Sequence, residues 1–203
     1  IADAKNYVVR KVTAATGIIS TVAGLGTKGS AGDGGPATSA YLDTPTGLFT
    51  TAAGDIYIAD SAAYTVRKVT AATGIITRVA GIPYSKGAQG DGGPATSAVL
   101  QAPNDLAVDA LGNLYIADLG GSAGRIRKVT PEGVISTIAG GGAAEAADGL
   151  PATSVRLFPS GVSVDAAGSL FISSQVRIYR VTPGGTISIV AGNGTIGSAG
   201  DNG

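Results

Sequence analysis

One string of amino acids recurs along this chain at an almost fixed spacing. GDGGPATSA occurs twice without change, at Gly32–Ala40 and Gly90–Ala98, and returns shortened as DGLPATS at Asp148–Ser154. The chain ends inside a fourth copy, Gly200–Gly203. The aspartates of the four copies are separated by 58, 57 and 53 residues; they are Asp33, Asp91, Asp148 and Asp201. Self-similarity of this kind predicts an array of like structural units, whose repeated surface we expect to bind rather than to catalyse.

Each unit also holds four short runs rich in Val, Ile, Thr and Tyr. In the best-preserved unit they cover Asp105–Asp109, Leu114–Ala117, Arg125–Val129 and Val134–Ala139. Runs of this length and β-branched content predict strands. The 33 glycines and nine prolines argue against long helices as the main element. Turn residues separate the runs, and Asp109–Gly112 has Asp first and Gly last, as a type I turn prefers.

The strand count predicts a particular all-β architecture. One four-stranded antiparallel sheet cannot bury both of its faces, whereas sheets stacked radially cover one another, as in a β-propeller. We name the strands of each blade a to d, from the innermost outward. Residues 1–203 then hold strands b, c and d of one blade and three full blades, about three and three-quarter blades. The approximate blade ranges are 1–24 (partial), 45–81, 103–140 and 159–192, joined by long connectors within one domain or fragment.

The same repeat resembles a known family. Pro103–Gly140 is the best match to P-x-G-L-x-x-D-x-x-G-N-L-Y-I-A-D-x-x-x-x-R-I-R-K-V-T followed by G-I-I-x-T-V-A-G, a pattern similar to the NHL repeat. This resemblance to the NHL-repeat β-propeller family covers nearly the whole chain and implies a propeller, commonly six-bladed. The Asn-His pair that names the repeat is absent, and Tyr7, Tyr64 and Gly124 stand near that point. Functions that relatives build from histidine are therefore not expected here.

The ends of the chain fall inside repeat units. We expect residues 1–203 to be part of a longer, six-bladed ring, and the true N-terminus to be missing. A small four-bladed ring, or a ring assembled from several chains, is the alternative. No apolar run approaches the roughly 18 residues of a membrane-spanning helix.

Composition narrows the possible chemistry. The chain has 14 basic and 14 acidic residues, a formal net charge of zero, and neither cysteine nor histidine. Nucleic-acid binders usually carry a basic excess, so no nucleic-acid partner is expected. Without cysteine there is no disulfide, thiolate nucleophile or Cys-ligated zinc. Without histidine the chain lacks the commonest general base and metal ligand.

The connectors from strand d to the next strand a run about twenty residues, a length that is usually functional or carries a small element of its own. Pro36–Leu42 predicts one helical turn, capped by Asp33 or the glycines before it. The connector leucines should plug into the core; they are Leu42, Leu100 and Leu157. We expect each connector aspartate to bond nearby backbone N–H groups. One carboxylate per connector is too few for the alternative, a calcium site, and GDGG lacks the ending of a P-loop. No metal or cofactor is therefore predicted.

Three further sets of residues recur in the units. Strand b ends in an aspartate, Asp3, Asp60 or Asp118, with Ser174 in the fourth unit, and we expect these side chains to contact backbone amides. The alternative is a ring of carboxylates at one mouth of the channel. Strand c carries Arg-Lys pairs, whose arginine should reach carbonyls or an aspartate; an anion-binding surface is the alternative. The pairs are Arg10-Lys11, Arg67-Lys68 and Arg127-Lys128. The strand b aromatics should lie in the core between blades; they are Tyr57, Tyr115 and Phe171.

No reactive cluster stands out, so no catalytic residue is predicted. We expect a non-catalytic binding or structural module for protein or glycan partners in a secreted or cell-surface assembly. Other copies of the same chain are among the partners that we expect. The triplet Asn193-Gly194-Thr195 is an N-glycosylation acceptor pattern and favours that location. Two alternatives stay open. One is a propeller enzyme of the lyase or lactonase type, as among six-bladed relatives, with its site mostly outside these residues. The other is an RNA-binding propeller, as some NHL proteins are.

Overall fold

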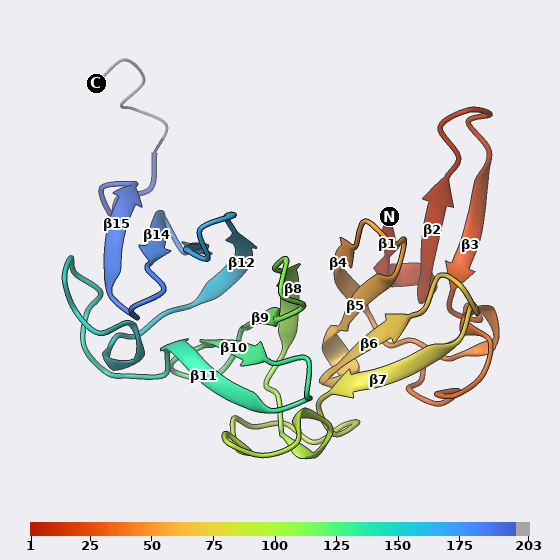
Figure 1. Cartoon of the computed structure of the whole chain (residues 1–203), viewed down its shortest axis with the longest axis horizontal. Coiled ribbons are helices and arrows are strands. Elements are labelled where there is room, and N and C mark those ends of the chain that lie inside the picture. The colour runs from red at the N-terminus through yellow and green to blue at the C-terminus, as the bar shows by residue number, and fades with distance from the viewer. Residues whose placement is uncertain (198–203) are drawn as a thin grey trace.

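The strands of the chain form four antiparallel sheets. The computed structural model describes residues 1–197, and we number its sheets blades 1 to 4 (Figure 1). Blade 1 holds β1 (Ala2–Asp3), β2 (Val8–Val12) and β3 (Ile19–Ala23). Blade 2 holds β4 (Pro45–Thr50), β5 (Ile56–Asp60), β6 (Thr65–Val69) and β7 (Ile76–Ala80). Blade 3 holds β8 (Pro103–Val108), β9 (Leu114–Asp118), β10 (Arg125–Val129) and β11 (Ile135–Gly140). Blade 4 holds β12 (Pro159–Val164), β13 (Leu170–Ser174), β14 (Arg177–Val181) and β15 (Ile187–Ala191).

The blades stand side by side along an arc. Figure 1 shows β4, β8 and β12 on the inner side of this arc and β7, β11 and β15 on the outer side. Neighbouring inner strands contact each other, β4 with β8 and β8 with β12, and β1, the strand b of blade 1, contacts β4. Within each full blade the strand order is sequential from inside to outside. The predicted all-β propeller of four-stranded blades, about three and three-quarter in number, is confirmed.

Hydrophobic side chains fill the spaces between blades. Strand b supplies a fully buried isoleucine at its centre in each full blade; these are Ile58, Ile116 and Ile172. Tyr115 packs in the core between blades 3 and 4, together with Leu170 and Val181, and Tyr57 packs against the core between blades 2 and 3. These two aromatic positions confirm the prediction. Phe171 differs, because it is half-buried on a face of blade 4 that no described blade covers.

The connectors contain the predicted helical turn and leucine plug. Ala37–Ser39, Ala95–Ser97 and Ala152–Ser154 each form a single 3-10 turn. The three connector leucines are at most 1% exposed, as predicted; they are Leu42, Leu100 and Leu157. Short 3-10 turns also follow β1 (Ala4–Asn6) and β5 (Ser61–Ala63). None of the helices in residues 1–197 has the length and apolar character needed to cross a membrane.

The expected helix cap is wrong, because the connector aspartate has a different partner. No side chain caps the turn at Ala37–Ser39. Asp33 Oδ1 instead accepts from Arg67 Nε and Nη2 at 3.0 and 2.8 Å, and Arg67 Nη1 donates to the Tyr41 carbonyl at 2.6 Å. The side chain of Arg67 is 1% exposed. A buried guanidinium must be paired, so the connector carboxylate turns toward the arginine and not toward backbone N–H groups.

Blade 3 repeats this contact between a strand c arginine and a connector aspartate, which we call the clamp, and blade 4 does not. Arg127 Nη2 donates to Asp91 Oδ1 at 2.7 Å, so the expected backbone bonding is wrong for Asp91 as well. Both arginine contacts confirm the prediction for strand c. In blade 4, Tyr179 occupies the position of the arginine, and Asp148 accepts from the backbone N–H of Ile189 at 2.7 Å, as expected. Asp201 and the rest of Gly200–Gly203 lie outside the described residues.

Candidate functional site

Two of the aspartates at the end of strand b bind the backbone just before strand a of the same blade. Asp60 Oδ1 accepts from the Asp43 backbone N–H at 2.6 Å. Asp118 Oδ1 accepts from the N–H groups of Gln101 and Ala102 at 2.8 and 2.9 Å. Both carboxylates are buried. The predicted contact with backbone amides is confirmed, and a carboxylate ring at an open channel mouth is wrong for these two residues.

The other two members of this set differ in their partners. Ser174 Oγ accepts from the Phe158 backbone N–H at 2.8 Å and so takes the structural role of the carboxylate. Asp3 instead lies 3.2 Å from Arg10 Nε and accepts from the Asn6 side chain, so the backbone contact expected for Asp3 is wrong. Asp3 is less buried, and its nearest donors are side chains. In residues 1–197, no three side chains of the types His, Cys, Asp and Glu lie close enough together to hold a metal ion.

Burial changes the titration of the strand b carboxylates. Burial raises the pKa of Asp60 to about 7, although the Asp43 N–H and the Arg67 charge act in the opposite direction. Burial likewise raises the pKa of Asp118 above its usual range, against the N–H groups of Ala102 and Gln101. The folded state therefore holds protons at these positions that the unfolded chain releases near pH 4.

This difference predicts that the protein becomes less stable as the pH rises from 5 to 8. A folded pKa above the unfolded value contributes stability below the unfolded pKa, and this contribution is lost as pH rises through the folded pKa. We expect the free energy of unfolding to fall by about 2 kcal/mol over this window. Urea unfolding of the wild type and of Asp60→Asn at both pH values measures the change. The Asn variant should lose the part of this dependence that Asp60 contributes and keep the part from Asp118, and an unchanged slope would assign the dependence to other groups.

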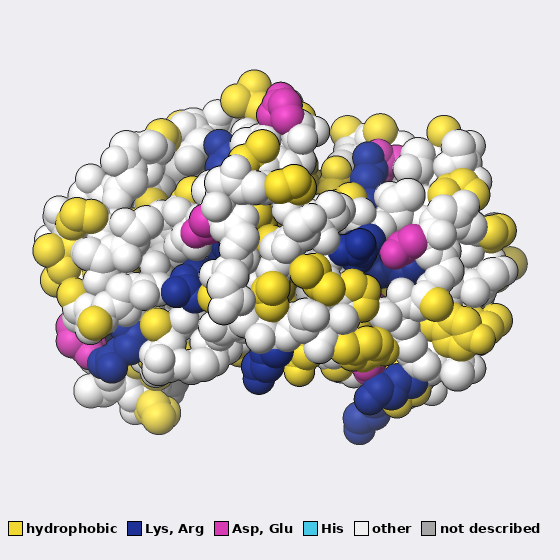
Figure 2. Space-filling view, turned by 90° about the horizontal axis from the view of Figure 1, so that it is seen from below, with side chains coloured by type: hydrophobic (Ala, Val, Ile, Leu, Met, Phe, Trp, Pro, Cys, Tyr) yellow, Lys and Arg dark blue, Asp and Glu magenta, His cyan; other side chains and the backbone are white. Residues whose placement is uncertain are grey.

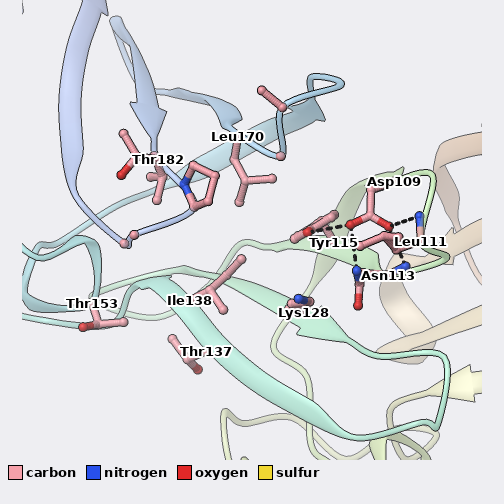
Figure 3. Close-up of a pocket in the computed structure, with 16 residues that line it drawn as sticks. Asp109, Leu111, Asn113, Tyr115, Lys128, Thr137, Ile138, Thr153, Leu170 and Thr182 are labelled. Atoms are coloured by element: carbon pink, nitrogen blue, oxygen red, sulfur yellow. Dashed lines mark hydrogen bonds between the residues drawn. The ribbon is translucent and has the colours of Figure 1, made fainter.

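A groove of about 560 Å³ lies between blades 3 and 4 (Figure 3). We call it the blade 3–4 groove. The turn after β8 and the side chains of Tyr115 and Lys128 form its blade 3 wall. Leu170 of β13 and the turn at 182–185 form the opposite wall, and Ile138 of β11 also lines it. The groove therefore combines an apolar lining with polar groups from blade 3.

The polar wall of this groove is fixed by hydrogen bonds to Asp109. Its carboxylate accepts from the Tyr115 hydroxyl at 2.9 Å and from Asn113 Nδ2 at 2.7 Å, and also from the N–H groups of Leu111 and Asn113 (Figure 3). Burial raises the pKa of Asp109, but these hydrogen bonds outweigh it and hold the pKa below its usual value. Burial and the bond to Asp109 raise the pKa of Tyr115 to about 12. At neutral pH, Asp109 is thus ionised and Tyr115 protonated.

Lys128 lines this groove and differs from its counterpart in blade 2 in the partners of its ammonium group. Its counterpart in blade 2, Lys68, lies 2.7 Å from Asp55 and 5.5 Å from the centre of the Tyr57 ring. Lys128 lies 6.0 Å from the centre of the Tyr115 ring. Asn113 occupies the position of Asp55, however, and within the described chain Lys128 makes no ion pair or hydrogen bond. Its ammonium group is thus available to a ligand in the groove.

The sequence pattern did not single out this groove. Lys128 appeared there only as the second member of a repeated Arg-Lys pair. The available signal was the exchange of Asp55 for Asn113 at one repeat position. On the face drawn in Figure 2, basic and acidic side chains form small separate groups among apolar ones, without one continuous basic field.

The predicted glycosylation triplet follows the last strand. Asn193 is exposed, and its Oδ1 accepts from the backbone N–H and the hydroxyl of Thr195 at 2.9 and 2.6 Å. The side chain is therefore accessible, while its modification stays a prediction.

Comparisons with known sequences agree with the repeat pattern. A family model described as the teneurin NHL domain matches residues 80–156. Teneurin-3 of Danio rerio is 31% identical over 119 residues, which cover 55% of this chain and 4% of that protein. Teneurin-1 of Gallus gallus is 28% identical over 119 residues, with the same coverage. The chain thus spans a small fraction of the length of these curated relatives.

Solved structures show the same fold. A streptogramin B lyase structure has a TM-score of 0.57 at 17% identity, covering 92% of this chain and 48% of that one. An auxiliary nutrient binding protein from Bacteroides thetaiotaomicron has a TM-score of 0.64 at 18% identity, covering 92% and 44%. A putative gluconolactonase has a TM-score of 0.58 at 14% identity, covering 94% and 57%. At these identities the likeness concerns the fold alone. The sequence and structure comparisons together confirm the predicted NHL-repeat propeller.

Proposed function

We propose that this NHL-repeat propeller is a non-catalytic binding or structural module, and that residues 1–203 form one propeller domain or part of one. Its blade 3–4 groove takes part of a protein or glycan partner. The observation that carries this proposal is the ammonium group of Lys128, which lacks an ion-pair partner in the described chain. A half-buried cation beside an apolar lining favours a ligand with a carboxylate next to an apolar or ring surface.

The protonation states in the groove favour binding over proton transfer. A general acid or base works best when its pKa lies near the working pH. Asp109 titrates below its usual range and Tyr115 only near pH 12, so neither exchanges a proton readily at neutral pH. Their hydrogen bonds instead fix the wall against which a ligand would pack.

The proposal includes a secreted or cell-surface location. The accessible Asn193 triplet supports it, as does the match to teneurin sequences. Mass spectrometry of the protein secreted from eukaryotic cells, before and after glycosidase treatment, tests whether Asn193 carries a glycan.

Binding in the groove is testable with two small probes. Glucuronic acid represents a glycan carboxylate, and N-acetyl-aspartate represents a protein carboxylate. We expect one of them to shift the backbone NMR signals of Tyr115 and Leu170 in a saturable titration. Lys128→Met keeps the apolar stem over Tyr115 but removes the charge, and should weaken that binding about tenfold, the usual effect of losing one charge-assisted hydrogen bond.

Lys68→Met is the matched control, because Lys68 already has Asp55 as its partner. This variant should bind the probe as the wild type does. Equal binding by wild type and Lys128→Met, or no shift with either probe, would contradict the proposal. Turnover of a lactone or a related substrate would instead support the enzyme alternative, which fits the lyase and gluconolactonase among the similar folds.

A further inference from the structure

Two loops of blade 4 are short at the same place. The turn between strands b and c has four residues in blade 2, Ser61–Tyr64, but two in blade 4, Gln175 and Val176. The connector that leads into blade 4 has 18 residues, 141–158, whereas the one that leads into blade 3 has 22, 81–102. Both segments lie at the end of strand b, so their shortening uncovers the same part of the blade.

A depression of about 310 Å³ lies where these two segments meet. We call it the arginine depression. Its polar lining includes Glu145, Arg156, Ser174, Gln175, Arg177 and Tyr179. It is separate from the blade 3–4 groove, whose lining comes from the turns at the opposite ends of the strands.

Arg177 lies opposite a neutral side chain, whereas its counterpart in blade 3 lies opposite a carboxylate. Arg125 is the cross-strand partner of Asp118, and its charge lowers the pKa of that carboxyl. The same cross-strand position pairs Arg177 with Ser174. The positive charge is therefore conserved between the two blades, whereas the negative charge is replaced by a neutral hydroxyl.

The guanidinium of Arg177 is held in place and still has a hydrogen-bond donor without a partner in the described chain. Gly194 lies against it so closely that a side chain at that position would overlap Nη2. Arg177 Nη2 donates to the Asn193 carbonyl at a long 3.4 Å, and its buried Nε has no hydrogen-bond partner in the described chain. A buried donor without a partner destabilises the protein unless a ligand or water satisfies it.

Arg156 places a second guanidinium in the depression. It stands at the repeat position of Tyr41 and Val99, where the other connectors carry no charge. Its ion-pair partner, Glu145, is 81% exposed at the side chain. An ion pair this exposed contributes little free energy, so Arg156 is free to turn toward an anion.

We propose that the arginine depression binds an oxyanion, the carboxylate, sulfate or phosphate group of a ligand, in place of the missing carboxylate. Arg177 supplies the planar donor fork that suits such groups, and Arg156 and the Ser174 hydroxyl supply further donors. The volume of about 310 Å³ suits a small ion or the end of a larger ligand.

The test is a titration with inorganic sulfate at constant ionic strength, followed by the side-chain Nε–Hε signals of the arginines in NMR spectra. We expect a saturable shift of the Arg177 signal. Arg177→Gln should weaken sulfate binding at least tenfold, in line with the loss of a charge-assisted contact. Arg180→Gln is the matched control, because Arg180 lies on the same strand but donates to Ser169 Oγ, and it should bind sulfate normally.

Ser174→Asp gives an independent test. It restores the carboxylate found at Asp60 and Asp118 and places it opposite Arg177, so its negative charge should compete with sulfate and weaken sulfate binding at least tenfold. Undiminished binding by Ser174→Asp or Arg177→Gln, or a linear, unsaturated shift, would overturn the proposal. Titration with acetate and with N-acetylglucosamine 6-sulfate distinguishes the sources. Additional shifts at Gln175 with the sugar would show that the depression binds the end group of a larger ligand. Equal affinity for inorganic sulfate and the sulfated sugar would show that it binds a free ion.

Discussion

Replacing Arg67 by methionine should lower the free energy of unfolding by about 3 kcal/mol. The variant leaves the Tyr41 carbonyl without its donor and Asp60 without its nearby positive charge. Removing one partner of a buried ion pair usually costs about 3–5 kcal/mol, and we expect the low end because Asp33 is one-third exposed and can be hydrated. Methionine keeps the apolar stem, so packing changes little. Urea unfolding at pH 7 measures the loss.

Two further variants separate the clamp from general effects. Lys11→Met removes an exposed charge from β2 and should change stability by less than about 0.5 kcal/mol. Arg67→Met combined with Asp60→Asn should be more stable than Arg67→Met alone. At pH 7 a buried Asp60 without the Arg67 charge must either take up a proton or stay ionised, and both cost free energy, whereas asparagine avoids this cost. A loss below about 1 kcal/mol in Arg67→Met would show that the connector does not depend on this arginine.

The strands were predictable because they depend on local patterns. Strand c of blade 3 has its predicted bounds, Arg125–Val129, and strand b extends one residue beyond the predicted Leu114–Ala117. Alternating apolar residues and the turn residues between them specify such strands within a few positions along the chain. The repeat then supports each assignment several times, since an equivalent strand must occur in every unit.

The contacts of the connector were harder to predict because they join distant residues. Arg67 and Asp33 are 34 positions apart, and their pairing requires the connector to fold back over the next blade. Local reasoning assigned Asp33 to a helix cap, which is the commonest role of an aspartate before a turn. That the strand c arginine would reach an aspartate or carbonyls was nevertheless predictable, because a buried guanidinium needs such partners.

The candidate sites follow from small departures between units. The exchange of Asp55 for Asn113, and of Asp118 for Ser174, is visible in the printed sequence. The consequence of each exchange is not visible in the sequence, because this consequence depends on which cation lies opposite the exchanged residue. The register of strands b and c pairs Ser174 with Arg177, as it pairs Asp118 with Arg125 in blade 3. A repeat thus predicts where to look, whereas the three-dimensional register decides which charge is left unpaired.

A glycine recurs at the end of each outer strand because the local structure leaves no room for a side chain there. Gly24, Gly81, Gly140 and Gly192 all have positive φ angles, and a side chain at any of them would overlap a backbone carbonyl at the start of strand c. Gly81→Ala should therefore lower the free energy of unfolding by about 3 kcal/mol, with contributions from the left-handed backbone and from the clash with the Tyr64 carbonyl. Gly74 is the matched control, since its φ is also positive, at +67°, while nothing lies within 4 Å of an added Cβ. Gly74→Ala should lose about 1 kcal/mol in the same urea unfolding experiment. Equal losses in the two variants would mean that backbone conformation alone, and not the close approach of strands d and c, requires glycine in every unit.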